Sequence, residues 1–250
     1  MSFIPVDLLR SGADELGVPL SDEQLDQMDR FASFLVETNK HLNLTRITDP
    51  RGIVSQHYLD SLACLSAADF PHGLRVIDVG TGAGIPGIPI KIARPDLSVA
   101  FLDSTRKKLD FITRAAAALG LDEPEVIHAR AEDAGRDPAY REQFDIALAR
   151  ALAQMQVASE LCLPLVRVGG MFIAQKSDSA EDEIKDSQTV IGELGGKVGE
   201  VVRVRIPHTN ITRHLVIVSK QAACPNQFPR AYSKIARSVS GGRRTGKTDS

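Results

Sequence analysis

Apolar positions in the first seventy residues recur at the three- and four-residue spacing that is typical of helices. A capping-box pattern, Ser21 followed by Gln24, precedes the first such run and predicts a helix over about Asp22 to His41. A second run begins near Ile53 and predicts a helix to about Ala68. We therefore expect a helical N-terminal extension, residues 1–70, ahead of any sheet.

From residue 74 the pattern changes to short apolar runs that alternate with helical stretches. Five runs are expected to be strands: Leu74–Val79, Val99–Leu102, Val126–His128, Phe144–Leu148 and Met171–Ala174. The segments Arg106–Leu119 and Ala180–Leu194 have helical periodicity and end at glycines. This alternation is typical of βαβ units and predicts an α/β fold with a mostly parallel, doubly wound sheet.

The last two apolar runs, Val198–Ile206 and His214–Val218, are too close together for a helix between them. They are expected to pair as an antiparallel hairpin at the edge of the sheet. Residues 71–222 would then form one Rossmann-like domain, and residues 223–250 would follow it as a flexible tail.

Composition and charge give this tail a possible role. The chain has 250 residues, 43% hydrophobic and 25% charged, which is enough for one sizeable core. Its net charge of -2 hides an asymmetry, because residues 220–250 hold seven Lys or Arg and one Asp, whereas residues 1–219 carry a net -8. A basic end on an acidic body indicates a polyanionic partner, and a solvated disordered tail is the alternative.

Several classes of protein are disfavoured by the sequence. No signal peptide is recognisable near Met1, and no apolar run approaches the roughly 18 residues of a membrane span. The three cysteines, Cys64, Cys162 and Cys224, form no C-x-x-C pair and are odd in number, which argues against a disulfide framework and a zinc site. We expect a cytoplasmic protein with no membrane or metal partner.

The strongest local motif lies directly after the first predicted strand, in the segment Asp78 to Gly87 with the sequence DVGTGAGIPG. Glycines at Gly80, Gly82 and Gly84 allow a sharp turn and close approach of the backbone to a ligand, and Pro86 suits the first turn of a helix. Such a loop is expected to hold the polar part of a nucleoside cofactor. A glycine-rich turn without a ligand is the structural alternative.

The same segment also fits the dinucleotide pattern G-x-G-x-x-G from Gly82, with Asp103 about twenty residues later. That frame begins two residues late relative to the strand end, and the predicted hairpin replaces a second mononucleotide half. A methyltransferase is therefore favoured over a nicotinamide-dependent oxidoreductase. Asp103 ends the second strand, where a carboxylate can accept hydrogen bonds from the ribose hydroxyls of a nucleoside or cap the next helix.

Three further segments lie where the carboxyl ends of strands should meet. Arg130-Ala131-Glu132-Asp133 could hold an adenine edge or form an ion pair within the loop, and Arg150 and Lys176 could contact RNA phosphate or a guanine edge or simply be solvated. Ala149 to Leu152 lacks both the D/N-P-P-aromatic tetrad of exocyclic amine methylation and a nucleophilic cysteine. This absence suits guanine N7, whose free lone pair requires orientation and electrostatics but no general base.

His57, Asp60 and Ser61 share one face of a predicted helix and raise the possibility of a hydrolase relay. No G-x-S-x-G elbow accompanies them, and residues on one helical face rarely form that relay. We interpret them as polar partners between the helical extension and the sheet, with an ordering effect on the glycine loop.

Taken together and in order, several segments between Asn39 and Lys220 resemble the glucose-inhibited division protein B family of 16S ribosomal RNA (guanine-N7) methyltransferases. The segments are Asn43-Leu44-Thr45, His57 to Leu62, Asp78 to Gly87, Leu102-Asp103-Ser104, Arg130-Ala131-Glu132, Ala149-Arg150-Ala151 and Arg213 to Val216. The resemblance implies a class I S-adenosylmethionine-dependent methyltransferase fold. It also implies methylation of a guanine in a decoding-region loop of 16S rRNA, and 16S rRNA, the small ribosomal subunit or an assembly intermediate is the expected partner. No stable protein partner is inferred from the sequence.

The resemblance also implies roles for individual residues. Arg150 and Lys176 become the candidate catalytic residues. The candidate cofactor contacts are Gly80, Gly82, Ile85, Asp103, Ala131, Glu132 and Arg150. The candidate RNA contacts are Lys176, Arg213 and Arg230. A nicotinamide-dependent oxidoreductase and a non-catalytic RNA-binding or assembly module stay open as alternatives.

Overall fold

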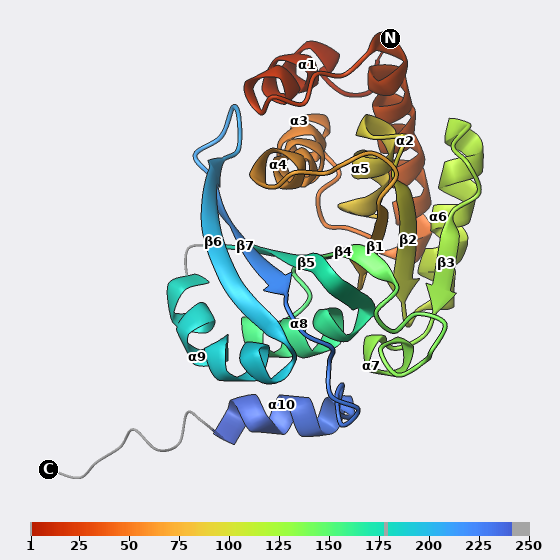
Figure 1. Ribbon diagram of the computed structural model, residues 1–250. Coiled ribbons are helices and arrows are strands. Elements are labelled where there is room, and N and C mark those ends of the chain that lie inside the picture. The colour runs from red at the N-terminus through yellow and green to blue at the C-terminus, as the bar shows by residue number, and fades with distance from the viewer. Residues whose placement is uncertain (1, 178–179, 242–250) are drawn as a thin grey trace, which may run out of the picture.

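Seven strands form one sheet in the part of the chain that the computed structural model describes, residues 2–177 and 180–241 (Figure 1). Their spatial order is β3-β2-β1-β4-β5-β7-β6. The strands are β1 (Arg75–Val79), β2 (Ser98–Asp103), β3 (Glu125–His128), β4 (Phe144–Arg150), β5 (Val166–Lys176), β6 (Gly196–Arg205) and β7 (Thr212–Lys220).

The first five strands in the chain are parallel, as the alternating pattern predicts. β1 pairs with β2 on one side and with β4 on the other, so the chain reverses its winding direction between β1 and β4. β7 pairs antiparallel with both β5 and β6, which confirms the predicted hairpin at the sheet edge. In such a sheet, ligands bind outside the carboxyl ends of the strands at the point of reversal.

Helices cover both faces of the sheet. The α-helices are α1 (Val6–Glu15), α2 (Asp22–Leu42), α3 (Pro50–Gly52), α4 (Asp60–Ala67), α5 (Gly87–Ala93), α6 (Arg106–Leu119), α7 (Ala131–Ala134), α8 (Met155–Cys162), α9 (Ala180–Glu193) and α10 (Tyr232–Gly241). A π-helix (Ile53–Leu59) leads into α4, and a 3-10 turn (Leu163–Leu165) follows α8. None of the helices in the described part of the chain is both long and apolar enough to cross a membrane.

The start of α2 shows how the sequence fixes an element. The Ser21 hydroxyl accepts from the amide of Gln24 at 3.2 Å, and the Gln24 side chain accepts from the amide of Ser21 at 2.8 Å, which confirms the predicted capping box. The helix ends at Asn43, whose φ of 50° is left-handed. α1 precedes α2 and was not predicted as a separate helix.

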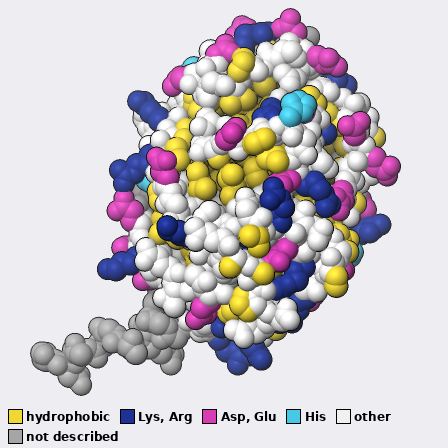
Figure 2. Space-filling model, in the orientation of Figure 1, with side chains coloured by type: hydrophobic (Ala, Val, Ile, Leu, Met, Phe, Trp, Pro, Cys, Tyr) yellow, Lys and Arg dark blue, Asp and Glu magenta, His cyan; other side chains and the backbone are white. Residues whose placement is uncertain are grey.

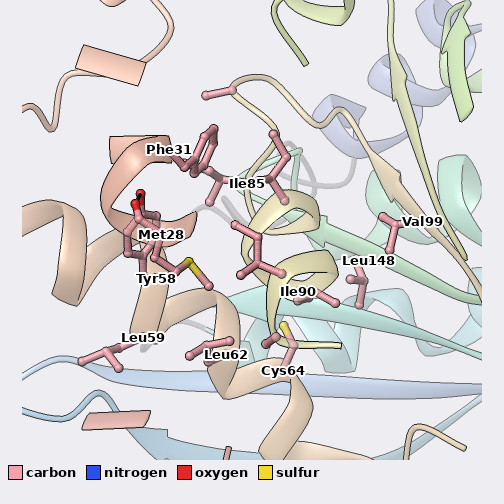
Figure 3. Close-up of a cluster of buried hydrophobic side chains, with 14 of the residues drawn as sticks. Met28, Phe31, Tyr58, Leu59, Leu62, Cys64, Ile85, Ile90, Val99 and Leu148 are labelled. Carbon is pink, nitrogen blue, oxygen red and sulfur yellow. Dashed lines mark hydrogen bonds between the residues drawn. The ribbon is translucent and has the colours of Figure 1, made fainter. Parts of the chain in front are cut away.

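Each face of the sheet has its own hydrophobic core. On one face the helical extension and α5 and α6 form a core with Phe31 and Tyr58 fully buried, and Figure 3 shows these side chains together with Met28 and Ile85. The hydroxyl of Tyr58 donates to the backbone oxygen of Met28 at 2.8 Å, so its burial leaves that group satisfied. The helical extension therefore shares a core with the sheet and holds a fixed position against it. On the other face, α8 and α9 cover the second core.

The chain end differs from the predicted flexible tail. After β7 the backbone runs back under α8, where the Arg141 guanidinium donates to the carbonyl oxygens of Cys224 and Phe228 at 2.6 and 2.8 Å. α10 then packs against α8 with Ile235 fully buried. These long-range partners order the segment through residue 241. Residues 242–250 lie outside the described part of the chain.

Candidate functional site

The glycine loop between β1 and α5 takes the conformation that its composition predicts. Gly80, Gly82 and Gly84 have φ values of 70°, 59° and 75°, which is the left-handed region that side chains disfavour. The amides of Gly80 and Thr81 donate to the carbonyl oxygen of Leu102 at 2.8 and 3.1 Å, which ties the loop to the end of β2. The loop is therefore held against the two neighbouring strand ends.

Asp78 stabilises this loop through two hydrogen bonds. Its Oδ2 accepts from the Thr81 hydroxyl at 2.6 Å and from the amide of Gly87 at 3.0 Å, and the residue is only 1% exposed. Burial raises the pKa of Asp78 to about 6, and the two hydrogen bonds limit that rise by favouring the ionised carboxylate. Because it is enclosed, Asp78 orders the loop and does not reach a ligand.

A cavity of about 260 Å³ opens beside the loop, and we call it the loop cavity. Its lining includes Gly80, Asp103, Ala131, Glu132 and Leu152. A side chain at Gly80 would enter this wall, because a Cβ there would lie 2.5 Å from Cδ1 of Leu152. Gly82 and Ile85 are not part of the lining, and Ile85 packs in the hydrophobic core instead.

Three hydrogen-bond donors hold the carboxylate of Asp103, the last residue of β2. Its Oδ2 accepts from the amide of Gly82 at 3.1 Å and from Lys108 Nζ at 3.3 Å, and its Oδ1 accepts from the amide of Thr105 at 2.8 Å. The bond to Thr105 resembles the predicted helix-capping role, although the cap position itself is Thr105. A carboxylate offers about four acceptor positions, so Asp103 retains capacity for a further donor in the loop cavity.

A second cavity, of about 370 Å³, lies on the other side of Leu152, and we call it the arginine cavity. It shares Ala151 and Leu152 with the loop cavity. Its charged and polar lining residues are Gln56, Asp60, Arg150, Gln175, Lys176, Ser177, Glu183 and Arg213. Ala151 has a φ of 52°, a left-handed conformation that is uncommon for alanine, at the junction of the two cavities.

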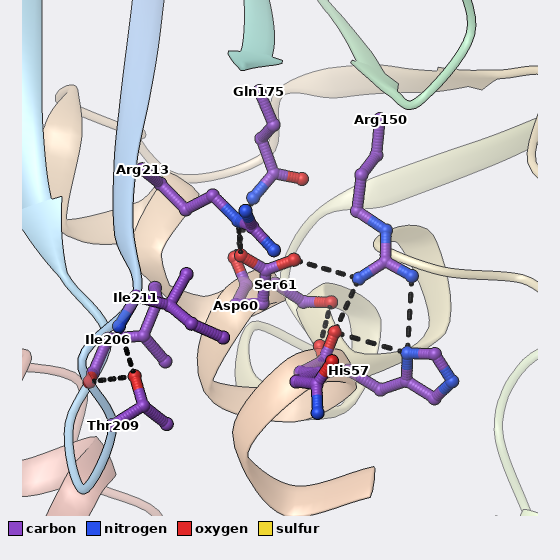
Figure 4. A network of polar contacts seen from close by, with 10 residues as sticks. His57, Asp60, Ser61, Arg150, Gln175, Ile206, Thr209, Ile211 and Arg213 are labelled. Atoms are coloured by element: carbon purple, nitrogen blue, oxygen red, sulfur yellow. Dashed lines mark hydrogen bonds and ion pairs between the residues drawn. The ribbon is translucent and has the colours of Figure 1, made fainter. Parts of the chain in front are cut away.

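Arg150 and Arg213 converge on one buried carboxylate in the arginine cavity (Figure 4). Asp60 is 1% exposed and accepts from Arg150 NH1 at 2.9 Å and from Arg213 Nε at 2.7 Å. Arg150 NH1 also donates to the backbone oxygen of Gln56 at 2.7 Å. The two guanidinium groups come from β4 and β7, so Asp60 fixes side chains from separate strands in one orientation.

His57 completes the Arg150 network as a neutral ring. Its Nδ1 lies 3.2 Å from Arg150 NH2, which can only donate, and 3.2 Å from the backbone oxygen of Gln56, which can only accept, so the tautomer of the ring selects one of these two partners. Nε2 is 2.9 Å from the hydroxyl of Thr45. Burial and the Arg150 charge lower the pKa of His57 to about 4. His57, Asp60 and Ser61 thus order Arg150, and no relay links them: Ser61 donates to the backbone oxygen of His57 at 2.5 Å.

Gln175 brings an unpaired acceptor to the arginine cavity. Its Nε2 donates to the backbone oxygen of Asp60 at 2.6 Å, and because that oxygen can only accept, the amide orientation is fixed. The other amide atom, Oε1, is buried and has no hydrogen-bond partner among the described residues. In Figure 4 this oxygen points away from Asp60, toward the side on which Arg150 lies. A buried acceptor of this kind favours binding of a donor.

Lys176 is positioned by its neighbours at the end of β5. Its Nζ donates to the backbone oxygen of Ala153 at 2.6 Å and to Glu183 Oε2 at 2.7 Å. Glu183 also accepts from the amide of Met155 at 2.8 Å, so it links the start of α8 to the lysine. Lys176 therefore has a fixed place in the arginine cavity and is not a freely solvated side chain.

Arg230 lies outside both cavities. Its guanidinium and amide bind the fully buried Glu160 of α8, with Nε at 2.9 Å, NH2 at 2.6 Å and the amide nitrogen at 2.7 Å. This places the predicted RNA contact in a structural ion pair that anchors α10. The structural alternative for the segment 130–133, an ion pair within the loop, is not found, because the Arg130 side chain has no ion-pair partner among the described residues.

The side chains that line the two cavities can orient a ligand and stabilise charge, and they include the carboxylates of Asp60, Glu132 and Glu183. Cys64, Cys162 and Cys224 are all free and buried, burial raises the pKa of each thiol, and none lines either cavity. Among the described residues, no group of three or more His, Cys, Asp or Glu could hold a metal ion. The two neighbouring cavities, which share Ala151 and Leu152, suit a nucleoside on one side and a second planar, polar group on the other.

The sequence prediction missed Gln175, Glu183, Leu152 and Tyr232 as lining residues. Gln175 precedes Lys176 at the same strand end, and this position was the one available signal. Glu183 and Tyr232 reach the cavities from α9 and α10, and the docking of those helices left no local pattern.

Comparison with known proteins gives a consistent result. The GidB family, described as rRNA small subunit methyltransferase G, matches residues 24–216 of this chain. The ribosomal RNA small subunit methyltransferase G of Pelotomaculum thermopropionicum is 42% identical over 224 residues, which cover 90% of this chain and 94% of the relative. The protein of the same name from Thermoanaerobacter pseudethanolicus is 42% identical over 233 residues, which cover 93% and 97%.

Proposed function

Because this chain belongs to the GidB family of rRNA small subunit methyltransferase G proteins, we propose that it transfers a methyl group from S-adenosylmethionine to N7 of a guanine in 16S rRNA. The observation that carries the proposal is the wall that the two cavities share at Ala151 and Leu152. This arrangement suits a methyl donor in the loop cavity and the base that accepts the methyl group in the arginine cavity.

The residues of the loop cavity fit S-adenosylmethionine. The absence of a side chain at Gly80 leaves room for close approach at the strand end, and Asp103 retains acceptor capacity for ribose hydroxyls. Ala131 and Glu132 line the far side, where they would face the adenine. When bound, the cofactor would supply a methyl group on a positively charged sulfur: a lone pair of the acceptor would form a bond to the methyl carbon as the carbon–sulfur bond breaks, with neutral S-adenosylhomocysteine as the leaving group.

The arginine cavity would hold the guanine. Its N7 carries no proton, so the protein need not provide a general base, and no cysteine is available for a covalent step. Arg150, fixed by Asp60 and the neutral His57, presents guanidinium N–H groups that can donate to O6 beside N7. Gln175 Oε1 would accept from the 2-amino group at the opposite end of the base.

The catalytic contribution is expected to come from alignment. Reaction brings positive charge onto the purine, and the carboxylate of Glu183 lies in the same cavity to offset it. Lys176 holds this carboxylate at 2.7 Å and thereby keeps it in place. Holding N7 in line with the methyl group can lower the barrier by roughly 7 to 11 kcal/mol.

The test is transfer of radiolabelled methyl from S-adenosylmethionine to small ribosomal subunits from a strain that lacks the activity. Label should appear in 16S rRNA and not in ribosomal protein. Calorimetry with S-adenosylmethionine and with NADH addresses the oxidoreductase alternative, which requires NADH to bind and S-adenosylmethionine not to bind.

A further inference from the structure

A third depression lies next to the loop cavity, on the side away from the arginine cavity, and we call it the cation hollow. It has a volume of about 360 Å³ and is lined at its basic positions by Arg130, Arg136, Arg230 and Lys234. Arg130 and Glu132 line both the cation hollow and the loop cavity. Figure 2 shows Lys and Arg side chains gathered over α7 and the start of α10, where the hollow lies. The three depressions therefore follow one another at the carboxyl ends of the strands.

The basic side chains of the hollow are only partly neutralised. Arg230 is offset by Glu160, and two carboxylates, Glu132 and Asp133, also line the hollow. Glu132 is largely buried and is shared with the loop cavity. This leaves three exposed cations, Arg130, Arg136 and Lys234, against one exposed carboxylate.

The side chains of these cations also have N–H groups that are not used in hydrogen bonds within the described part of the chain. Within residues 2–177 and 180–241, the side chains of Arg130 and Lys234 form no hydrogen bond or ion pair, and Arg136 gives one bond of 3.1 Å to the backbone oxygen of Gln227. Residues 1–219 carry a net charge of -8, and the hollow is the place where Arg230 and Lys234 from the basic end of the chain meet Arg130 and Arg136 of the acidic body.

The hollow is a fixed feature because both of its walls are anchored. The ion pair between Arg230 and the buried Glu160 holds the chain just before α10, and Ile235 is fully buried against α8. Lys234 lies between these two anchors. The other wall is α7 and its flanking residues, which pack against α8 as well.

We propose that the cation hollow binds backbone phosphates of the RNA strand that flanks the target guanine. The inference rests on the proposed function and adds a second contact point, separated from the arginine cavity by the loop cavity. Phosphates are the fitting ligand because exposed, unpaired Arg and Lys donors bind them without reading sequence. RNA held in both depressions would lie across the loop cavity.

The test compares the double variant Arg136→Gln/Lys234→Gln with the matched control Lys197→Gln. Lys197 is an exposed lysine at the start of β6, on the opposite rim of the sheet. Binding of each protein to small subunits is measured by filter retention over a salt series, together with methyl transfer and calorimetric affinity for S-adenosylmethionine. Arg130 is left unchanged because it also lines the loop cavity.

For the double variant we expect subunit affinity to fall by about threefold or more. The slope of log affinity against log salt should become shallower by roughly 1.4, which corresponds to two lost phosphate contacts. Affinity for S-adenosylmethionine and turnover at saturating subunit should stay at the wild-type values, and the control should match wild type throughout. An unchanged salt slope, or a parallel loss of cofactor affinity, would overturn the proposal.

The two proposals fail in different ways. If wild type binds subunits with the steeper slope but transfers no methyl group, the proposed function fails and the cation hollow stands. If wild type methylates 16S rRNA and the double variant has the same salt slope, the cation hollow fails and the function stands.

Discussion

The guanidinium of Arg150 and the carboxylate of Asp60 lie 2.9 Å apart, and this ion pair joins β4 to the helix that begins at Asp60. Arg213 on β7 binds the other carboxylate oxygen at 2.7 Å. One buried acid thus sets the positions of two cations in the arginine cavity. Its loss should affect both folding and catalysis.

Replacement of Asp60 by Asn removes the charge with little change in shape and leaves two guanidinium groups without a counter-charge. We expect the free energy of unfolding to fall by about 3–5 kcal/mol in chemical denaturation. The matched control is Asp26→Asn, which breaks the exposed pair with Arg30 at 2.8 Å and should cost less than about 1 kcal/mol. Equal losses in the two variants would contradict the role of Asp60.

Gly80 and Gly17 separate backbone strain from cofactor binding. Both have φ near 70°, so an alanine at either position should destabilise the fold by about 1–2 kcal/mol. Only the Gly80 Cβ meets another side chain, Leu152, whereas nothing lies within 4 Å of a Cβ at Gly17. Gly80→Ala should therefore weaken binding of S-adenosylmethionine by roughly tenfold, about 1.4 kcal/mol, in calorimetry.

The clash also predicts a rescue. Adding Leu152→Ala to Gly80→Ala removes the contacting atoms and should restore part of the lost affinity. A folded Gly80→Ala variant that binds the cofactor and methylates at wild-type levels would show that the loop does not hold it. The opposite outcome decides against the non-catalytic module alternative: if the folded Gly80→Ala variant still binds RNA but has lost the methyl transfer that wild type shows, that alternative fails.

His57 should make stability depend on pH in a defined window. The pKa of His57 is about 4 in the folded protein and ordinarily about 6.5, so below pH 6.5 the unfolded chain binds a proton that the folded chain does not bind. The contribution of His57 is therefore complete above pH 6.5 and is lost as the pH falls toward 4, by on the order of 3 kcal/mol.

The measurement is the difference in unfolding free energy between wild type and His57→Gln at each pH. This comparison is needed because Asp78 acts with the opposite sign: its folded pKa is raised to about 6, so its contribution is lost as the pH rises. The difference should shrink between pH 6.5 and 4. A difference that is constant over this range would mean that the pKa of His57 is the same in the folded and the unfolded protein.

Gln175 predicts a preference for guanine over inosine, which lacks the 2-amino group but keeps N7. Wild type should methylate subunits with inosine at the target position about three- to tenfold less efficiently in kcat/KM, as expected for one hydrogen bond. Gln175→Leu should show almost equal efficiency on the two substrates. If the variant discriminates as strongly as wild type, Oε1 does not contact that amino group.

Local sequence patterns predicted most of the fold because each element carries its own signal. The capping box at Ser21, the glycine loop after β1 and the short connection between β6 and β7 were all confirmed. These signals act over a few residues, where periodicity and backbone conformation decide the outcome.

The parts that the sequence did not predict depend on contacts between distant residues. Asp60 meets partners 90 and 153 positions away, and nothing near residue 60 indicates which cations will reach it. The ion pair between Arg230 and Glu160, 70 positions earlier, likewise has no local signal in the sequence, and the predicted RNA contact of Arg230 stays a prediction. The order of the segment through residue 241 depends on that pair and on Ile235.

The central claim is that the methyl group goes to guanine N7, and chemical scission of the product RNA tests it most directly. Small subunits methylated by this protein are reduced and treated with aniline, which cleaves RNA at 7-methylguanine, and the break is mapped by primer extension. We predict one new break in 16S rRNA, dependent on S-adenosylmethionine and absent with Arg150→Ala. Labelled 16S rRNA that resists scission would place the methyl group on another atom and contradict the account.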